Sequence, residues 1–194
     1  MEIAELNGIL EFLRQAEQLK NTIRSAWTSK GRPESVAEHT WRLCLMVMLF
    51  EKEYPKIDFS RLIKMCVIHD LGEVIGGDIP AIEQDESQDK SIQERKDLLT
   101  LLKPLPEVLK KEITHLWDEY EAAVTPEAKL AKALDKLETI QQHNQGENPV
   151  DFNYQFNLGY GKKYTTEDPL IVSIRTILDQ ETEKRANSQS THPV

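Results

Sequence analysis

Residues 62–70 read LIKMCVIHD, a mostly apolar run that ends in His69 and Asp70. A buried run seldom keeps two adjacent polar side chains unless something offsets the cost of taking them out of water. A divalent cation would offset that cost, because imidazole and carboxylate groups both bind such ions. The alternative for this pair is a histidine at a helix C-terminus, stabilised by the helix dipole. The stretch therefore directs attention to further ligands elsewhere in the chain.

Helical periodicity dominates the chain on both sides of this run. Apolar residues mark one face of a helix over residues 3–19. The same pattern, with its caps and breakers, predicts helices over about 36–54, 59–71, 87–102, 107–123, 126–143 and 168–185. No segment alternates apolar and polar residues over a sustained stretch, so no strand is expected.

Two segments fall outside this helical pattern. Residues 144–167 have no clear period and are rich in aromatic side chains, and a loop of that length usually covers a site or an interface. The polar residues 186–194 are expected to form a disordered tail. The sequence therefore predicts an all-α fold with one domain over residues 1–185.

The composition limits the class of protein. The chain has 194 residues, 29% of them charged, and a formal net charge of −9, which argues against a basic surface for nucleic acid. Cys44 and Cys66 lie in apolar runs, as is typical of buried thiols in a reducing compartment. The longest apolar stretch, residues 43–50, is too short to cross a bilayer. We therefore expect a cytoplasmic protein with no nucleic-acid or membrane partner.

Two more candidate ligands stand on other helices. His39 shares a helical face with Val36, Leu43 and Met46, so its ring faces the core, where it is either a hydrogen-bonded core residue or a ligand. Asp135 lies in the middle of a helix, where aspartate has poor propensity and no capping role. Its alternative is a solvated pair with the next lysine. With the first pair, these residues make two imidazoles and two carboxylates, a set that suits Mn, Fe, Co, Ni or Zn.

The order of these residues resembles the HD-domain metal-dependent phosphohydrolase superfamily. The segments RPESVAEH (32–39), HDLGE (69–73) and GDIP (77–80) are similar to its 5′-deoxynucleotidase branch. The resemblance covers roughly residues 6–145 and implies an HD-type helical bundle.

The resemblance also implies roles for single residues. His39, His69, Asp70 and Asp135 match the metal ligands, and Glu73, acting beside Asp70, matches the catalytic acid/base or water-positioning group. The matching substrate-binding residues are Arg24, Trp27, Asp78, Ile79, Pro80 and Ala81. Some members carry the tryptophan directly after the arginine, where this chain has Ser25. Selectivity against the 2′-hydroxyl is therefore expected less firmly than hydrolysis.

The implied function is a phosphomonoesterase that hydrolyses deoxyribonucleoside 5′-monophosphates with one divalent transition metal, and the implied assembly is a homodimer. A phosphomonoester repels hydroxide, and one divalent ion offsets its charge and lowers the pKa of bound water. Arg24 offers a planar fork of donors to phosphate, and Glu73 follows Asp70 by one helical turn. Two alternatives stay open: hydrolysis of another nucleotide (a phosphodiester, a triphosphate or an alarmone), and a non-catalytic helical nucleotide-binding module with a structural metal.

Overall fold

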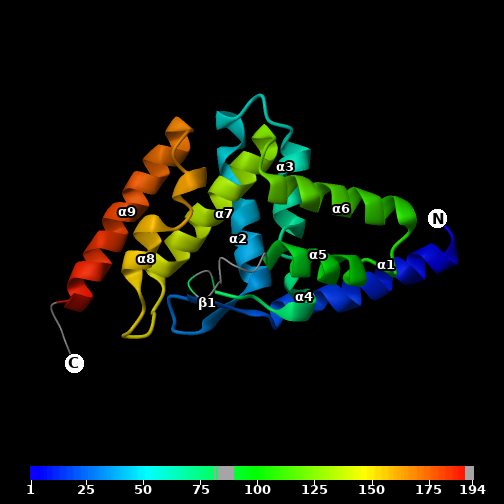
Figure 1. The fold of residues 1–194 in the computed structure, drawn as a ribbon, viewed down its shortest axis with the longest axis horizontal. Helices are drawn as coiled ribbons and strands as arrows, with labels where there is room; N and C mark the ends of the chain where they lie inside the picture. The colour runs from blue at the N-terminus through cyan, green and yellow to red at the C-terminus, as the bar shows by residue number, and fades with distance from the viewer. Residues whose placement is uncertain (81, 83–89, 191–194) are drawn as a thin grey trace.

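The structure is a computed structural model that describes residues 1–80, 82 and 90–190 (Figure 1). Its regular elements are α1 (Ile3–Ala16), η1 (Glu17–Lys20), β1 (Ile23–Trp27), β2 (Pro33–Ser35), α2 (Val36–Phe50), η2 (Glu51–Glu53), α3 (Phe59–Ile68), α4 (Glu73–Gly76), α5 (Lys90–Leu101), α6 (Glu107–Ala122), α7 (Pro126–Gln145), α8 (Tyr154–Gly159), η4 (Lys162–Tyr164) and α9 (Pro169–Ser190). The chain is a mostly helical bundle, as the sequence predicts.

Helix α7 is the central element of this bundle. It contacts α2, α3 and α6 on one side and α9 on the other, and most of its residues are buried. Figure 1 shows the same division, with α8 and α9 on one side of α7 and the remaining long helices on the other. A residue on α7 can therefore meet side chains from both halves of the molecule.

Polar caps fix where the three helices of the core begin. Ser35 caps α2 in a capping box with Glu38, and Asp58 accepts a hydrogen bond from the Arg61 N–H at the start of α3. Thr125 accepts from the Ala128 N–H, and Pro126 occupies the first turn of α7. The expected helix starts at residues 59 and 126 are confirmed.

A small antiparallel sheet is the main departure from the expected fold. Strands β1 and β2 pair with Ile23 opposite Ser35 and Trp27 opposite Pro33. The turn between them needs Gly31, whose φ of 70° is unfavourable for a residue with a side chain. The expectation of no strand is therefore wrong. Strands of five and three residues are too short to establish an alternating pattern, and pairing across the turn defines them.

The end of the chain is also more ordered than expected. Helix α9 continues to Ser190, so residues 186–190 are helical rather than part of a disordered tail. Ala186 is buried, the Arg185 guanidinium donates to the Gly146 carbonyl, and the Gln189 amide donates to the Val150 carbonyl at 3.0 Å. These contacts to residues 146–150 stabilise a polar helix end that composition alone marks as disordered. Residues 191–194 lie outside the described residues.

Two further boundaries differ from the expectation. Helix α3 ends at Ile68, so His69 and Asp70 follow it rather than lie within it, and the segment 144–167 contains α8 and η4. Across the described residues, no helix combines the length and the apolar character needed to cross a bilayer.

Candidate metal centre and active site

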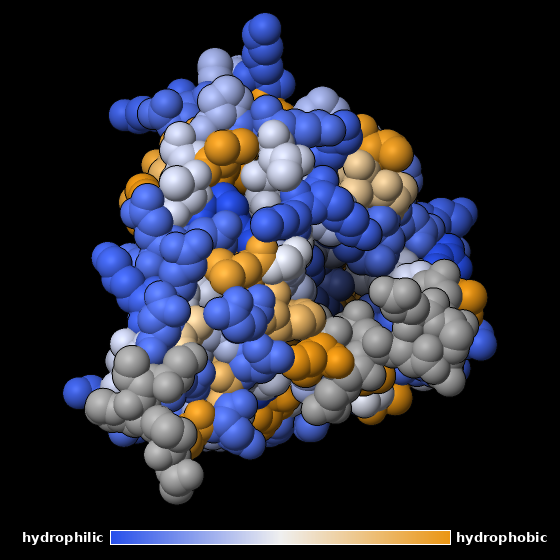
Figure 2. Space-filling model, turned by 60° about the vertical axis from the view of Figure 1, so that its left-hand side comes forward, coloured by the Kyte–Doolittle hydropathy of each residue, from blue (hydrophilic) through white to orange (hydrophobic). Residues whose placement is uncertain are grey.

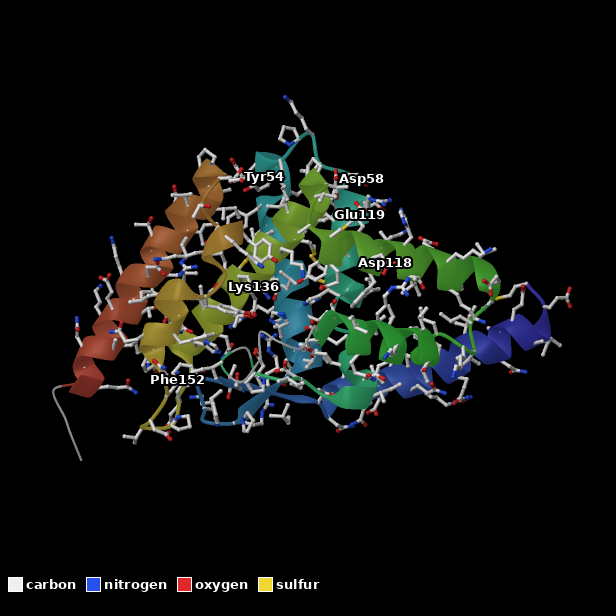
Figure 3. The ribbon with its side chains drawn as sticks, in the orientation of Figure 1. Tyr54, Asp58, Asp118, Glu119, Lys136 and Phe152 are labelled. Atoms are coloured by element: carbon white, nitrogen blue, oxygen red, sulfur yellow. The ribbon has the colours of Figure 1, made fainter. Side chains whose placement is uncertain are left out.

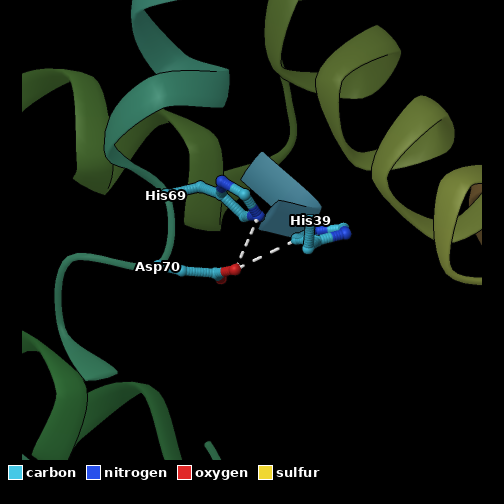
Figure 4. A group of neighbouring side chains, drawn as sticks. All are labelled: His39, His69 and Asp70. Carbon is cyan, nitrogen blue, oxygen red and sulfur yellow. Dashed lines mark ion pairs between the residues drawn. The ribbon is translucent and has the colours of Figure 1, made fainter. Parts of the chain in front are cut away.

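The four predicted ligands meet at one point, although they come from three parts of the chain. His39 lies on α2, His69 and Asp70 follow α3, and Asp135 lies on α7; Figure 4 shows the first three side chains turned towards one another. The His39 Nε2 atom is 3.2 Å from Asp135 Oδ1 and 3.9 Å from Asp70 Oδ2. The His69 Nε2 atom is 3.1 Å from Asp70 Oδ2 and 3.9 Å from Asp135 Oδ1.

The Nε2 atoms of His39 and His69 show whether this cluster suits a metal. Both are buried and have no hydrogen-bond partner among the residues that the structure describes. The His69 Nδ1 atom donates to the Cys66 carbonyl at 2.8 Å, so the Nε2 atom of a neutral ring is a bare acceptor. A buried acceptor that faces carboxylate oxygens is unfavourable unless a cation stands between them. The donor set therefore fits a divalent metal.

Electrostatics show the same need for positive charge. Burial lowers the pKa of His39, but Glu138 and Asp135 outweigh burial and raise that pKa to about 9. Burial raises the pKa of Asp70, but His69 and His39 outweigh it and hold that pKa below its usual range. Each shift reports a buried cluster whose carboxylates favour a bound cation.

Further hydrogen bonds and ion pairs orient the candidate ligands. The Glu138 carboxylate accepts from His39 Nδ1 and, at 2.5 Å, from Arg42 Nε. The Tyr120 hydroxyl donates to Asp135 Oδ2 at 2.8 Å, and Lys136 Nζ lies 2.8 Å from the same oxygen. These contacts leave Asp135 Oδ1 to face the two imidazoles. Asp135 is 4% exposed, so the solvated-pair alternative is wrong.

Glu34, His39 and Glu138 form another group of metal-ligand types. Arg42 already pairs with Glu138, and Arg24 Nε lies 4.0 Å from Glu34. Because two guanidinium groups supply positive charge there, this group positions His39 and is not a second ion site.

The cluster opens into a cavity of about 440 Å³. Figure 2 shows a hollow in one face of the molecule, with hydrophilic and hydrophobic side chains around it. The predicted residues that line the cavity are Arg24, Trp27, Asp70, Glu73, Asp78, Ile79, Pro80 and Asp135. His39 and His69 lie behind it, and Ala81 lies outside the described residues. Ser25 also lines the cavity, so the departure from the family pattern falls at the site itself.

Glu73 begins α4 and is buried, so it is not a solvated glutamate at a helix end. Its position depends on Gly72, because a Cβ atom there would come within 2.7 Å of the Glu94 carbonyl oxygen. Lys90 Nζ donates to Glu73 Oε1 at 3.1 Å. Burial raises the pKa of Glu73 to about 9, helped by Asp70.

Arg24 reaches the cavity from β1 and is held by α7. Its Nη2 atom donates to Thr139 Oγ1 at 3.0 Å, and that hydroxyl donates to the Asp135 carbonyl at 3.1 Å. Burial lowers the pKa of Arg24, but nearby carboxylates, with Asp70 first among them, outweigh it and keep the guanidinium charged. A planar cation therefore stands close to the metal cluster.

Several cavity residues escape the sequence analysis. Lys90, Lys136 and His143 line the cavity, together with Phe152 and other side chains from residues 149–160. Figure 3 shows Lys136 in the middle of α7 and Phe152 below α8. His143 lies in the last turn of α7, where a charged histidine would favour the helix dipole, but burial lowers its pKa to about 4, so it is neutral. Its spacing of two helical turns from Asp135 is the signal that could have found it.

The family profile of the HD domain matches residues 16–174, which span the whole cluster and the cavity. The chain belongs to the HD-domain family. This HD domain is 34% identical to human 5′-deoxynucleotidase HDDC2 over 142 residues, 72% of this chain and 69% of the relative. It is 31% identical to 5′-deoxynucleotidase HDDC2 of Dictyostelium discoideum over 191 residues, 91% of this chain and 99% of the relative.

A solved structure gives the same grouping. A predicted metal-dependent phosphohydrolase from Magnetospirillum magnetotacticum shares 27% identity with this HD domain, and the match has a TM-score of 0.76 and covers 94% of this chain and 95% of that one. The chain is therefore an HD-type hydrolase whose family implies a divalent metal.

Proposed function

We propose that this HD domain hydrolyses deoxyribonucleoside 5′-monophosphates to deoxynucleoside and phosphate. One observation carries the proposal: the imidazole–carboxylate cluster opens into a cavity that also presents Arg24, Lys90 and Lys136. A phosphomonoester carries two negative charges near neutral pH, and a cation cluster of this kind is suited to hold it. The relatives named 5′-deoxynucleotidase support the choice of substrate.

The proposed ligands of one divalent transition metal are His39, His69, Asp70 and Asp135. When bound, such an ion polarises a phosphoryl oxygen and lowers the pKa of bound water. Cobalt, manganese, zinc, nickel and iron all suit this donor set, so a metal panel is part of the test.

The chain's own residues supply the rest of the proposed mechanism. Arg24 binds phosphate oxygens through its planar fork, fixed by Thr139. Glu73 takes a proton from the attacking water or delivers one to the leaving sugar oxygen, with Asp70 orienting the water beside it. Lys90 holds the Glu73 carboxyl in place.

The remaining predicted residues contact the substrate in this proposal. Asp78 and the backbone of Ile79 and Pro80 line the cavity where they can do so, and Ala81 lies outside the described residues. Trp27 stands in the cavity wall against Phe152, with ring centroids 6.4 Å apart, where it can crowd a 2′-hydroxyl. The corresponding measurement is the ratio of activity on each deoxyribonucleotide to that on its ribonucleotide.

The test is phosphate release from deoxyribonucleoside monophosphates by purified protein loaded with each of the five metals. We expect turnover in the wild type and background release in His69→Ala and Asp70→Ala. His115→Ala is the matched control, since that histidine lies on the exposed face of α6 with 73% of its side chain accessible. Full activity in His69→Ala would refute the proposed site.

The same assay separates the two alternatives. Products from phosphodiesters, triphosphates and alarmones show whether another nucleotide is the better substrate. If the metal is only structural, we expect the protein to hydrolyse none of these compounds. A chelator should then lower its melting temperature. The cytoplasmic location and the homodimer remain predictions. Light scattering of the purified chain tests whether it forms a dimer.

A further inference from the structure

The end of the cavity away from the metal cluster contains a hydrogen-bond donor that no described residue pairs with. Asn157 lies on α8, is completely buried and lines the cavity. Its Oδ1 atom pairs with His143 Nδ1 at 2.9 Å. Its Nδ2 atom has no hydrogen-bond partner within the described part of the chain. A buried amide donor without a hydrogen bond lowers the stability of the fold, so this atom is suited to donate to a ligand.

His143 places an acceptor beside that donor. Because Asn157 Oδ1 can only accept, the proton of the ring sits on His143 Nδ1. Burial keeps the ring neutral, as its lowered pKa shows, so Nε2 carries a lone pair. His143 also lines the cavity, and the two side chains therefore offer one donor and one acceptor.

Aromatic rings flank this pair. Phe152 packs edge-on against the His143 ring with centroids 4.9 Å apart, and Phe156 lines the same part of the cavity. The backbone of α8 is held in place, since Arg175 Nη2 donates to the carbonyls of Asn157 and Leu158 at 2.8 Å and 3.0 Å. The pair and its aromatic neighbours are thus a fixed surface rather than a loose loop.

The pair is also displaced along α7 from the metal cluster. His143 follows Asp135 by eight residues on one helix, a rise of roughly 12 Å. Thr139, which bonds to Arg24, lies between them, so a phosphate bound between Arg24 and the proposed ion leaves the other end of the same nucleotide to reach the pair. Nucleobases have a flat π-face for aromatic side chains and polar edges for donors and acceptors.

We propose that Asn157 and His143, flanked by Phe152 and Phe156, bind the nucleobase of the substrate. The inference rests on the proposed function, because it assigns the far end of the same cavity. In this proposal the aromatic rings contact the face of the base, and Asn157 and His143 bond to one edge. We therefore expect the site to distinguish substrates with a base from those without one more strongly than it distinguishes one base from another.

The experiment compares kcat/KM for dAMP with that for 2-deoxyribose 5-phosphate, which keeps the sugar and phosphate but lacks the base. We expect the wild type to favour dAMP by at least about tenfold, since base–aromatic contacts of this kind contribute that much. Asn157→Asp keeps the acceptor for His143 and removes the Nδ2 donor. It should lower the ratio about tenfold.

Phe156→Leu is the second variant, in case Asn157→Asp does not fold; it keeps apolar volume, removes the ring and should lower the ratio about fivefold. Asn144→Asp is the matched control. Asn144 is also a buried asparagine, but it lies on α7 and its side chain bonds to Leu178 and Thr182, away from the cavity. Its variant should leave the ratio unchanged.

Binding of deoxyadenosine, measured by calorimetry, needs no turnover and separates this inference from the proposed function. Binding that Asn157→Asp weakens supports the base site even if no phosphate is released from any nucleotide. A wild-type ratio near one without deoxyadenosine binding overturns the base site, although the phosphatase stands. An equal loss on both substrates in Asn157→Asp and Phe156→Leu overturns it too, because the residues would then act on the fold or the sugar.

Discussion

The two ends of the cavity are built in different ways. At the metal end, His39 and Asp135 lie on core helices and His69 follows one, and protein partners fix His39 Nδ1, His69 Nδ1 and Asp135 Oδ2. At the far end, β1 and residues 149–160 supply aromatic rings around an amide donor that has no partner among the described residues. The proposed reaction is thus assigned to the end where buried charges are held by the core, and the proposed recognition of the base to a wall added to that core.

The largest expected effect is at the metal end. Asp135→Asn keeps the shape of the side chain but removes one negative charge that a cation needs, so we expect activity to fall by at least about 10³-fold. Bound metal, measured by elemental analysis, should fall with it. A chelator should have the same effect on the wild type, and metal added back should restore only the wild type. Retained metal and activity in the variant would contradict the assigned ligand set.

A smaller effect is expected at Glu138, which contacts the candidate ligand His39. Glu138→Gln removes the charge that orients His39 through its Nδ1 proton, and we expect metal affinity to fall by about 10–100-fold. Competition with a chromogenic chelator measures this change. Glu112→Gln, an exposed glutamate on α6, is the control and should bind metal as the wild type does. Unchanged affinity in Glu138→Gln would mean that Glu138 matters only for packing.

At the far end we expect a change in binding rather than in the chemical step. Phe152→Leu removes the ring that packs on His143 and Trp27, so KM for dAMP should rise about fivefold while kcat stays within about twofold. Steady-state kinetics at saturating metal measure both constants. A fall in kcat with an unchanged KM would show that the two ends are not separable.

The smallest expected effect comes from the end of α9. A chain that stops after Arg185 loses the burial of Ala186 and the Gln189–Val150 hydrogen bond, so we expect a loss of about 1 kcal/mol and a melting temperature lower by about 2–4 °C. A chain that stops after Ser190 is the control. Metal affinity should be the same in both, because the removed residues contact the segment that follows α7, as the Gln189–Val150 bond shows. Equal melting temperatures would show that these contacts add no stability.

Much of the metal end was predictable because its signals are local. An aspartate in the middle of a helix and a His-Asp pair at the end of an apolar run stand out against helical periodicity. The starts of α3 and α7 followed from Asp58 and Thr125-Pro126, whose caps act within one helical turn. Tyr120 was not predicted as a partner of Asp135, and Lys136 was considered only as a solvated one, because nothing in their own segments marks this contact as part of the core.

The amino-acid sequence by itself indicated the helical class, the four candidate ligands and the family, since each depends on residue types at short spacings. Only the tertiary structure decided that β1 pairs with β2, that residues 149–160 form a cavity wall, and that Asn157 meets His143. The physical reason is range: caps and helical faces are set by neighbours within a few residues. Burial and pairing between distant segments are decided by packing, which no local pattern contains.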